Sequence, residues 1–198
     1  IMSSDWSSDV CSSDLTEPVD AMTELVQQES GLPRSRVLGI GGILDAARLR
    51  TEIAEAVGVN AEDVDARVIG THNAAMIPML QYTAVSGIPV ADLLSDSDLA
   101  AAVARTRTAG DRILEGLQRS AGFYGSAAAI ADVVEAVCRN SGRILDLSCR
   151  LEGEYGVRGM TMSVPVIVGK NGAEQILDLD RTPEQQRPLD ALAKEAQR

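Results

Sequence analysis

The sequence predicts an α+β fold in which helices pack on an antiparallel sheet. Stretches with helical spacing of apolar residues occupy much of the segment 16–140. Three strand-like runs lie close together after residue 142, and an Asn-Gly pair joins the last two, which is typical of an antiparallel hairpin. The repeated strand-helix-strand order of a complete nucleotide-binding fold is missing.

Three elements are predicted between residues 16 and 60. Pro18 suits the first position of a helix, Gly31 and Pro33 end it, and its apolar face consists of Val19, Met22, Leu25 and Val26. Residues 36–42 are expected to form a short strand that runs into glycines. An amphipathic helix follows over 44–60, with Leu49, Ile53 and Val57 facing the core.

The rest of the chain alternates between helices and strands. Residues 65–70 favour a strand, and a polar cluster follows directly at its end. The remaining predictions are helices near 97–119, with Gly110 inside, and 124–140, strands at 143–149, 160–168 and 174–180, and a final helix after Thr182-Pro183-Glu184. Pro165, within the middle of these three strands, favours an edge position or a bulge.

Composition excludes several classes of function. The chain has 198 residues and a formal charge of −11. Nucleic-acid binding is not expected, because phosphate binding needs clustered Lys and Arg. No run approaches the ~18 apolar residues of a membrane span, so no membrane contact is expected. Cys138 and Cys149 lack metal-ligand or redox spacing, and we expect buried free thiols of a cytoplasmic protein with no bound metal.

Residues 1–15, IMSSDWSSDVCSSDL, differ from everything that follows. The triplet Ser-Ser-Asp occurs three times and no periodicity accompanies it. The segment resembles the translation of a DNA-sequencing adapter, and we interpret it as non-native; a disordered tail is the alternative. Without its three aspartates the formal charge is −8.

One histidine, His72, stands out as a candidate catalytic residue. Its ordinary pKa lies nearest to neutral, which suits proton transfer, although a lone histidine is more often structural. Asp45 and Arg48 lie three apart on a predicted helix and therefore share one face. An exposed ion pair is the simple interpretation. The alternative is that Asp45 orients His72, while the planar fork of Arg48 binds a carboxylate.

A series of motifs is similar to the lactate/malate dehydrogenase family, and most similar to its malate dehydrogenases that resemble lactate dehydrogenase. The motifs run in order from Thr16 to about Ala193: T-E-P-V-D at 16–20, S-G-L-P-R-S-R-V at 30–37, L-D-A-A-R-L-R at 44–50, V-I-G-T-H at 68–72, S-G-I-P-V at 86–90, G-E-Y-G-V at 153–157 and S-V-P-V-I-V-G-K-N-G at 163–172. The resemblance implies the C-terminal catalytic domain over 43–198. It also implies a remnant of the NAD-binding Rossmann domain over 16–42, with most of that domain lacking.

The resemblance also implies roles for individual residues. His72 would be the proton donor and acceptor, Asp45 its orienting partner and Arg48 the clamp on the substrate carboxylate. Glu17 stands where the family has a cofactor- and substrate-binding Asn, and Asn73-Ala74 stand where it commonly has Gly-Asp. A carboxylate at position 17 would repel an anionic substrate.

The expected activity is NAD-dependent interconversion of malate and oxaloacetate, by a homodimer or homotetramer when the protein is full length. Gly122, Phe123 and Tyr124 resemble the pocket region of malate enzymes. The glycine-rich G-x-G-x-x-G turn for the cofactor is missing, so the 198-residue chain alone is expected to be inactive. Lactate dehydrogenase and a non-catalytic paralogue acting as an interaction module are the alternatives.

Overall fold

The computed structural model describes residues 18–117 and 123–195. Its helices are α1 (Val19–Ser30), α2 (Gly41–Val57), α3 (Asp96–Leu117), α4 (Phe123–Cys138) and α5 (Pro183–Glu195). Its strands are β1 (Val64–Asp65), β2 (Val68–Ile69), β3 (Ile77–Pro78), β4 (Ala84–Val85), β5 (Ile88–Pro89), β6 (Arg143–Glu152), β7 (Arg158–Gly169) and β8 (Gly172–Ile176). The prediction of an α+β fold with helices on antiparallel sheets is confirmed. The segment 1–15 lies outside the described residues.

The main sheet has the order β6-β7-β8, and all its neighbours are antiparallel. The predicted hairpin between β7 and β8 is confirmed, with Gly169 paired to Gly172. Among the four residues Gly169–Gly172 of this hairpin, Gly172 alone has a positive φ, of 91°, so the left-handed residue follows the two-residue turn Lys170-Asn171. Gly172 also lies close to the Ser35 carbonyl, where a Cβ would be 2.0 Å from its oxygen. A side chain would not fit at this position.

Pro165 lies in the central strand β7, so the predicted edge position is wrong. Its carbonyl accepts a hydrogen bond of 2.9 Å from the N–H of Leu177, one residue beyond the end of β8. In an antiparallel pair the N–H and C=O of one residue point to the same neighbour. The missing N–H of Pro165 therefore falls where β8 ends, and the irregularity in register lies nearby, between Ile167 and Val168.

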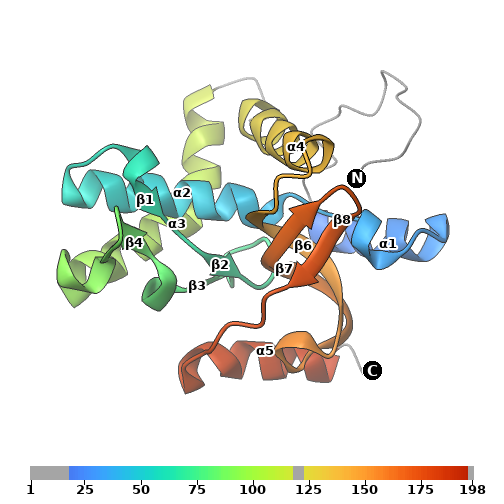
Figure 1. Ribbon diagram of the computed structural model, residues 1–198. Coiled ribbons are helices and arrows are strands. Elements are labelled where there is room, and N and C mark those ends of the chain that lie inside the picture. The colour runs from blue at the N-terminus through green and yellow to red at the C-terminus, as the bar shows by residue number, and fades with distance from the viewer. Residues whose placement is uncertain (1–17, 118–122, 196–198) are drawn as a thin grey trace.

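Two hydrophobic clusters meet at α2. Figure 1 shows α2 running across the molecule, with the β6-β7-β8 sheet toward one end and α3, β1 and β4 toward the other. The larger cluster lies between the sheet, α4 and α5, and includes Leu147, Val164 and Leu189. The smaller cluster joins α2 to α3 through Leu49, Ile53 and Ala102. Because both clusters bury residues of α2 or of its neighbours, the position of this helix is fixed along its length.

The start of α2 corrects the prediction of a strand over residues 36–42. Only a single bridge forms there, between Gly39 and Ser148, and the helix already begins at Gly41. Both Gly41 and Gly42 are buried, and a Cβ on Gly41 would lie 2.7 Å from the Cβ of His72. The glycines are needed for close contact with their neighbours rather than for a turn after a strand.

Other boundaries and burial patterns differ in detail from the predictions. The predicted strand at 65–70 is split into β1 and β2, and the one at 174–180 ends at Ile176. Leu25, assigned to the buried face of α1, is 48% exposed. Cys149 is buried, but Cys138 at the end of α4 is exposed, and both are free. Burial raises the pKa of the Cys149 thiol to about 12.

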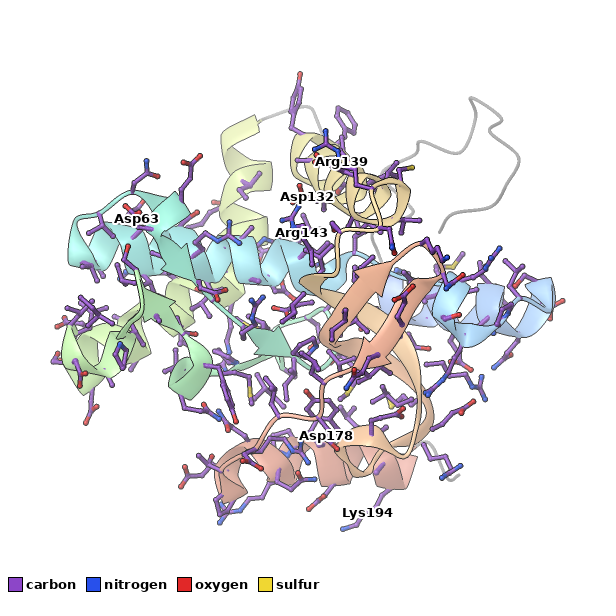
Figure 2. The ribbon with its side chains drawn as sticks, in the orientation of Figure 1. Asp63, Asp132, Arg139, Arg143, Asp178 and Lys194 are labelled. Atoms are coloured by element: carbon purple, nitrogen blue, oxygen red, sulfur yellow. The ribbon has the colours of Figure 1, made fainter. Side chains whose placement is uncertain are left out.

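The predicted cap of the last helix is confirmed in its hydrogen bonds. The Thr182 hydroxyl accepts from the Gln185 N–H at 3.3 Å, and the Gln185 side chain accepts from the Thr182 N–H at 2.9 Å. Figure 2 shows Asp178 near this helix, while Asp132, Arg139 and Arg143 lie together around α4 and the start of β6. In the described ranges, no helix is both long and apolar enough to cross a membrane.

Candidate active site

His72 follows β2 by three residues, and its backbone is held on both sides. Gly70 exchanges two backbone hydrogen bonds of 2.9 Å with Ser163 of β7, which ties the end of β2 to the main sheet. Asp20 of α1 then accepts a hydrogen bond of 2.8 Å from the His72 N–H. The loop that carries His72 is therefore fixed between α1 and β7.

Asp45, on α2, contacts the imidazole ring of His72. The distance from its Oδ2 to His72 Nδ1 is 2.8 Å, and both side chains are buried, with exposed fractions of 4% for His72 and 7% for Asp45. A carboxylate on Nδ1 sets the tautomer in which Nδ1 carries a proton and Nε2 is available for chemistry. Sequence reasoning proposed this pairing, and the structure brings the two residues together.

The surroundings raise the pKa of His72 above its ordinary value of 6.5. Burial alone lowers the pKa, and Arg48 acts in the same direction, but the hydrogen bond and charge of Asp45, helped by the charge of Asp20, outweigh both. The surroundings therefore favour the protonated imidazole. A histidine in this state can donate a proton and take it back at physiological pH.

Arg48 lies one helical turn after Asp45 and contacts its other oxygen, with Nη1 to Oδ1 at 3.3 Å. Its side chain is 26% exposed. The predicted ion pair therefore forms, yet it is not a simple surface pair, because it borders a cavity of about 170 Å³. That cavity is lined by Asp45, Arg48 and His72, by Asn73, Ala74 and Met76 of the loop, and by Thr106, Arg107, Gly110 and Asp111 of α3.

Gly110 lines the cavity, and the sequence showed only that it lies inside a predicted helix. A Cβ at this position would lie 3.3 Å from Arg48 Nη2, so the guanidinium lies directly over α3 at this glycine. Glycine inside a helix costs about 1 kcal/mol relative to alanine, and such a residue usually has a packing reason. Here the packing reason is the Arg48 guanidinium, which passes over Gly110 where it reaches the cavity.

Three further charged residues near His72 were not predicted as site residues. Arg107 and Asp111 line the cavity, and Arg107 donates a hydrogen bond of 3.4 Å to the Met76 carbonyl. Asp20 contacts the His72 backbone. Arg107 and Asp111 could have been found from the sequence only by their spacing of four on the predicted helix, which places them on one face, with Gly110 three residues after Arg107.

Some predicted residues fall elsewhere. Glu17 and Gly122 lie outside the described residues. Phe123 and Tyr124 are 50% and 81% exposed and do not line the cavity. Asn73 and Ala74 do line it, and the Asn73 side chain accepts from the Ala75 N–H at 2.8 Å, which holds the turn after His72.

The described residues fit only part of a dinucleotide cofactor. His72 lines the cavity, and no hydrogen bond to its Nε2 occurs within the described ranges. A phosphate site at the glycine-rich start of α2 does not fit, because a Cβ on Gly42 would meet the Asp146 carbonyl oxygen at 2.7 Å. Within the described part of the chain, no group of three or more His, Cys, Asp or Glu could hold a metal ion.

The fold and the cavity together define a class of protein. A buried histidine with a carboxylate on one ring nitrogen, next to a partly exposed guanidinium, can bind a small organic acid and exchange a proton with it. Residues 43–197 match the alpha/beta C-terminal domain of lactate/malate dehydrogenase. The chain belongs to the lactate/malate dehydrogenase family, as the motifs predicted.

Within this family, curated relatives of the chain are malate dehydrogenases. The enzyme from Chlorobium phaeobacteroides is 43% identical over 178 residues, which is 90% of this chain and 56% of that protein. The enzyme from Bacillus pumilus is 42% identical over 89% of this chain and 56% of its own length. The chain thus spans little more than half the length of these relatives.

Solved structures of both enzyme types share the fold. A malate dehydrogenase from Aeropyrum pernix superposes with a TM-score of 0.85 at 38% identity and covers 91% of this chain and 60% of its own. A lactate dehydrogenase from Cryptosporidium parvum, complexed with lactic acid and nicotinamide adenine dinucleotide, gives 0.84 at 37% identity, covering 90% of this chain and 58% of its own. Overall similarity of fold therefore does not separate the two substrates.

Proposed function

We propose that this chain is the catalytic part of an NAD-dependent malate dehydrogenase, which interconverts malate and oxaloacetate. The observation that carries the proposal is the convergence of His72, Asp45 and Arg48 on one cavity in a chain of this family. The family match and the relatives' printed names support the reaction class, and the site residues support its acid-base step.

Each of the three residues has a distinct task in this proposal. Arg48 binds the carboxylate next to the reacting carbon, with the free part of its planar guanidinium as a two-pronged donor. His72 donates its Nε2 proton to the carbonyl oxygen of the 2-oxo acid during reduction and takes it back during oxidation. Asp45 orients the imidazole and stabilises its charged form. NADH, when bound, supplies the hydride that reaches the reacting carbon.

Malate is favoured over lactate by the names of the most similar curated relatives and by a second cation at the cavity. Arg107 lines the same cavity as Arg48, and a dicarboxylate substrate needs a positive charge for each carboxylate. The matching lactate dehydrogenase structure keeps lactate as the second candidate, because its TM-score of 0.84 is almost the same as the 0.85 of the Aeropyrum pernix malate dehydrogenase.

The organisation of the whole protein is part of the proposal. Residues 16–42 would belong to the cofactor-binding half, 43–198 would form the catalytic domain, and Glu17 would stand at a cofactor-contacting position. We also propose a cytoplasmic location, since Cys138 and Cys149 are free. Assembly into a homodimer or homotetramer would follow the pattern expected for the family.

A hybrid enzyme tests the proposed substrate. The segment from Thr16 onward is joined to the cofactor-binding half of the Bacillus pumilus malate dehydrogenase, and NADH oxidation is measured with oxaloacetate and with pyruvate. We expect a higher kcat/KM with oxaloacetate. The control is the 198-residue chain alone, which is expected to oxidise no NADH because it lacks the site that would bind and orient the cofactor.

Two other outcomes of this assay have clear meanings. Faster reduction of pyruvate than of oxaloacetate would identify a lactate dehydrogenase. A hybrid that is folded, binds NADH and reduces neither substrate would contradict the proposal and favour a non-catalytic paralogue. Binding of NADH by fluorescence and folding by circular dichroism distinguish this result from simple failure of the hybrid to assemble.

The Gly110→Ala substitution should separate stability from substrate binding. Alanine favours the helix by up to about 1 kcal/mol, yet its Cβ would lie 3.3 Å from Arg48 Nη2 and displace the guanidinium. We expect the hybrid carrying it to unfold at equal or higher temperature and to have a KM for oxaloacetate raised about tenfold, with Gly116→Ala, in open space on the same helix, as the matched control. An unchanged KM would show that Arg48 does not depend on this glycine.

A further inference from the structure

Asp20, in the first turn of α1, uses both of its carboxylate oxygens on groups outside its own helix. Its Oδ2 accepts from the His72 N–H at 2.8 Å, and its Oδ1 accepts from the Ser148 hydroxyl at 2.7 Å. The acid at the start of a helix is commonly explained by its interaction with the helix dipole or by capping. Here the helix start has no side-chain cap hydrogen bond. The contacts of Asp20 therefore point to a tertiary role.

The partner of Asp20 on β6 is rigid. Ser148 is fully buried, its hydroxyl also contacts that of Ser163 at 2.9 Å, and its backbone exchanges two hydrogen bonds with Gly39. Ser163 is in turn paired with Gly70, two residues before His72. Asp20 thus closes a ring of hydrogen bonds that runs from α1 through β6 and β7 to the histidine loop.

Space around this ring is tight. The Cβ position of Gly41 lies 2.7 Å from the His72 Cβ and 2.9 Å from Val19 of α1, so α1, α2 and the histidine loop meet with no room for a side chain. A shift of α1 would consequently move His72. Because α1 belongs to the segment 16–42, this contact couples the cofactor-side segment to the acid-base residue.

We propose that Asp20 is a positioning residue for His72: its carboxylate fixes the His72 backbone N–H from α1 and places a second negative charge next to the imidazole. Asp45 holds the ring of His72, and Asp20 holds its backbone. The inference rests on the proposed function for its catalytic meaning, since it describes how the proton donor is held.

The electrostatic consequence has a definite direction. The groups that face the imidazole are Asp20 from α1, Asp45 and Arg48 from α2, and Arg107 and Asp111 across the cavity from α3. The charge of Asp20 raises the pKa of His72, as does that of Asp45. Burial raises the pKa of Asp20 itself, while its hydrogen bonds from Ser148 and His72 lower it. Removing the Asp20 charge should therefore lower the pKa of His72.

The chain is well suited to a direct test, because His72 is its only histidine. Its ring resonances can be followed by NMR through a pH titration of the 198-residue protein without assignment ambiguity, and exchange of its backbone amide can be measured in the same samples. The variants are Asp20→Asn and Asp20→Ala, and the matched control is Glu29→Gln, an exposed acid on the same helix.

The two variants separate the effect of the Asp20 charge from the effect of its hydrogen bond with the His72 N–H. Asparagine keeps a carbonyl oxygen for the His72 N–H, and its amide can donate to the Ser148 hydroxyl, which also accepts. We expect Asp20→Asn to lower the pKa of His72 by about half a unit to one unit while amide exchange stays slow. We expect Asp20→Ala to lower the pKa similarly and to speed amide exchange about tenfold or more, because the N–H loses its acceptor.

Two results would overturn the proposal. One is a His72 pKa in Asp20→Asn equal to that in Glu29→Gln. The other is amide exchange of His72 in Asp20→Ala as slow as in the parent. If Asp20→Ala fails to fold, Ser148→Ala takes its place, because it removes the hydroxyl that holds the Asp20 carboxylate. The His72 amide in this variant should exchange faster than in the parent. Neither readout needs cofactor or substrate, so an inactive hybrid enzyme would contradict the proposed function and leave these results unaffected.

Discussion

Replacing His72 by asparagine is expected to lower the kcat of the hybrid enzyme with oxaloacetate about 10²–10⁴-fold, the usual contribution of a general acid. Asparagine can still donate a hydrogen bond but cannot give up a proton. KM should change little, because the carboxylate of the substrate is bound by Arg48 rather than by the imidazole. Steady-state NADH oxidation measures both constants, and thermal unfolding of the variant checks that the fold is kept.

Asp45→Asn is the companion to this variant and has a signature in pH. Asp45 raises the pKa of His72, so its charge extends the range in which the imidazole is protonated toward higher pH. Reduction of oxaloacetate needs the protonated form. The variant should therefore lose activity with rising pH earlier than the parent. A His72→Asn enzyme whose kcat stays within tenfold of the parent's would contradict the role assigned to His72. An Asp45→Asn enzyme that loses activity at the same pH as the parent would contradict the role assigned to Asp45.

The three proposed site residues could be found from the sequence because each carries a recognisable signal. His72 is the only histidine in the sequence, and Asp45 and Arg48 are three residues apart on a predicted helix. Motif resemblance then placed them in one family. The structure adds distances and burial, and shows that the ion pair borders a cavity instead of open solvent.

The remaining site residues depend on contacts between distant segments, which local patterns do not contain. Asp20 and Ser148 are 128 positions apart and meet only because α1 packs on β6. The early start of α2 has a similar cause, since Gly41 and Gly42 resemble the end of a strand until their contacts with His72 and β6 are known. Of the two alternatives for Pro165, an edge position or a bulge, the edge position was wrong, because the end of β8 cannot be located from the strand pattern alone.

Asp146, on β6, is a buried acid that the proposed reaction does not use. It is 2% exposed, its Oδ2 accepts from the Val68 N–H at 3.2 Å, and its Oδ1 has no hydrogen bond. Arg67 approaches Oδ1 only to 3.8 Å and is shared with Asp65. Burial therefore outweighs these partners and raises the pKa of Asp146 from 3.8 to about 7.

This shift makes stability depend on pH in a predictable direction. A carboxyl group with a raised pKa in the folded state binds its proton more tightly there than in the unfolded chain. The contribution of Asp146 to the free energy of unfolding therefore falls as pH rises from about 4 to about 7 and is constant above that. At ~1.4 kcal/mol for each unit, the buried charge costs about 4 kcal/mol above neutral pH.

Asp146→Asn should remove much of this cost. The asparagine oxygen can still accept from the Val68 N–H, but its amide group would face Arg67, so we expect a gain of about 2 kcal/mol at pH 8 rather than the full amount. At pH 4.5, where the parent carboxyl is protonated, the two proteins should be nearly equal. Urea unfolding of the 198-residue chain at both pH values measures the difference.

The matched control is Asp63→Asn, an exposed acid whose side chain Figure 2 shows at the surface near α2. It removes the same formal charge without burial, so its effect should be small and should not change between the two pH values. A stability gain in Asp146→Asn that is equal at pH 4.5 and pH 8 would mean that packing, not a buried charge, limits this part of β6. A gain confined to pH 8 would show that this carboxyl group, which lies outside the proposed active site, makes the fold less stable when it is charged.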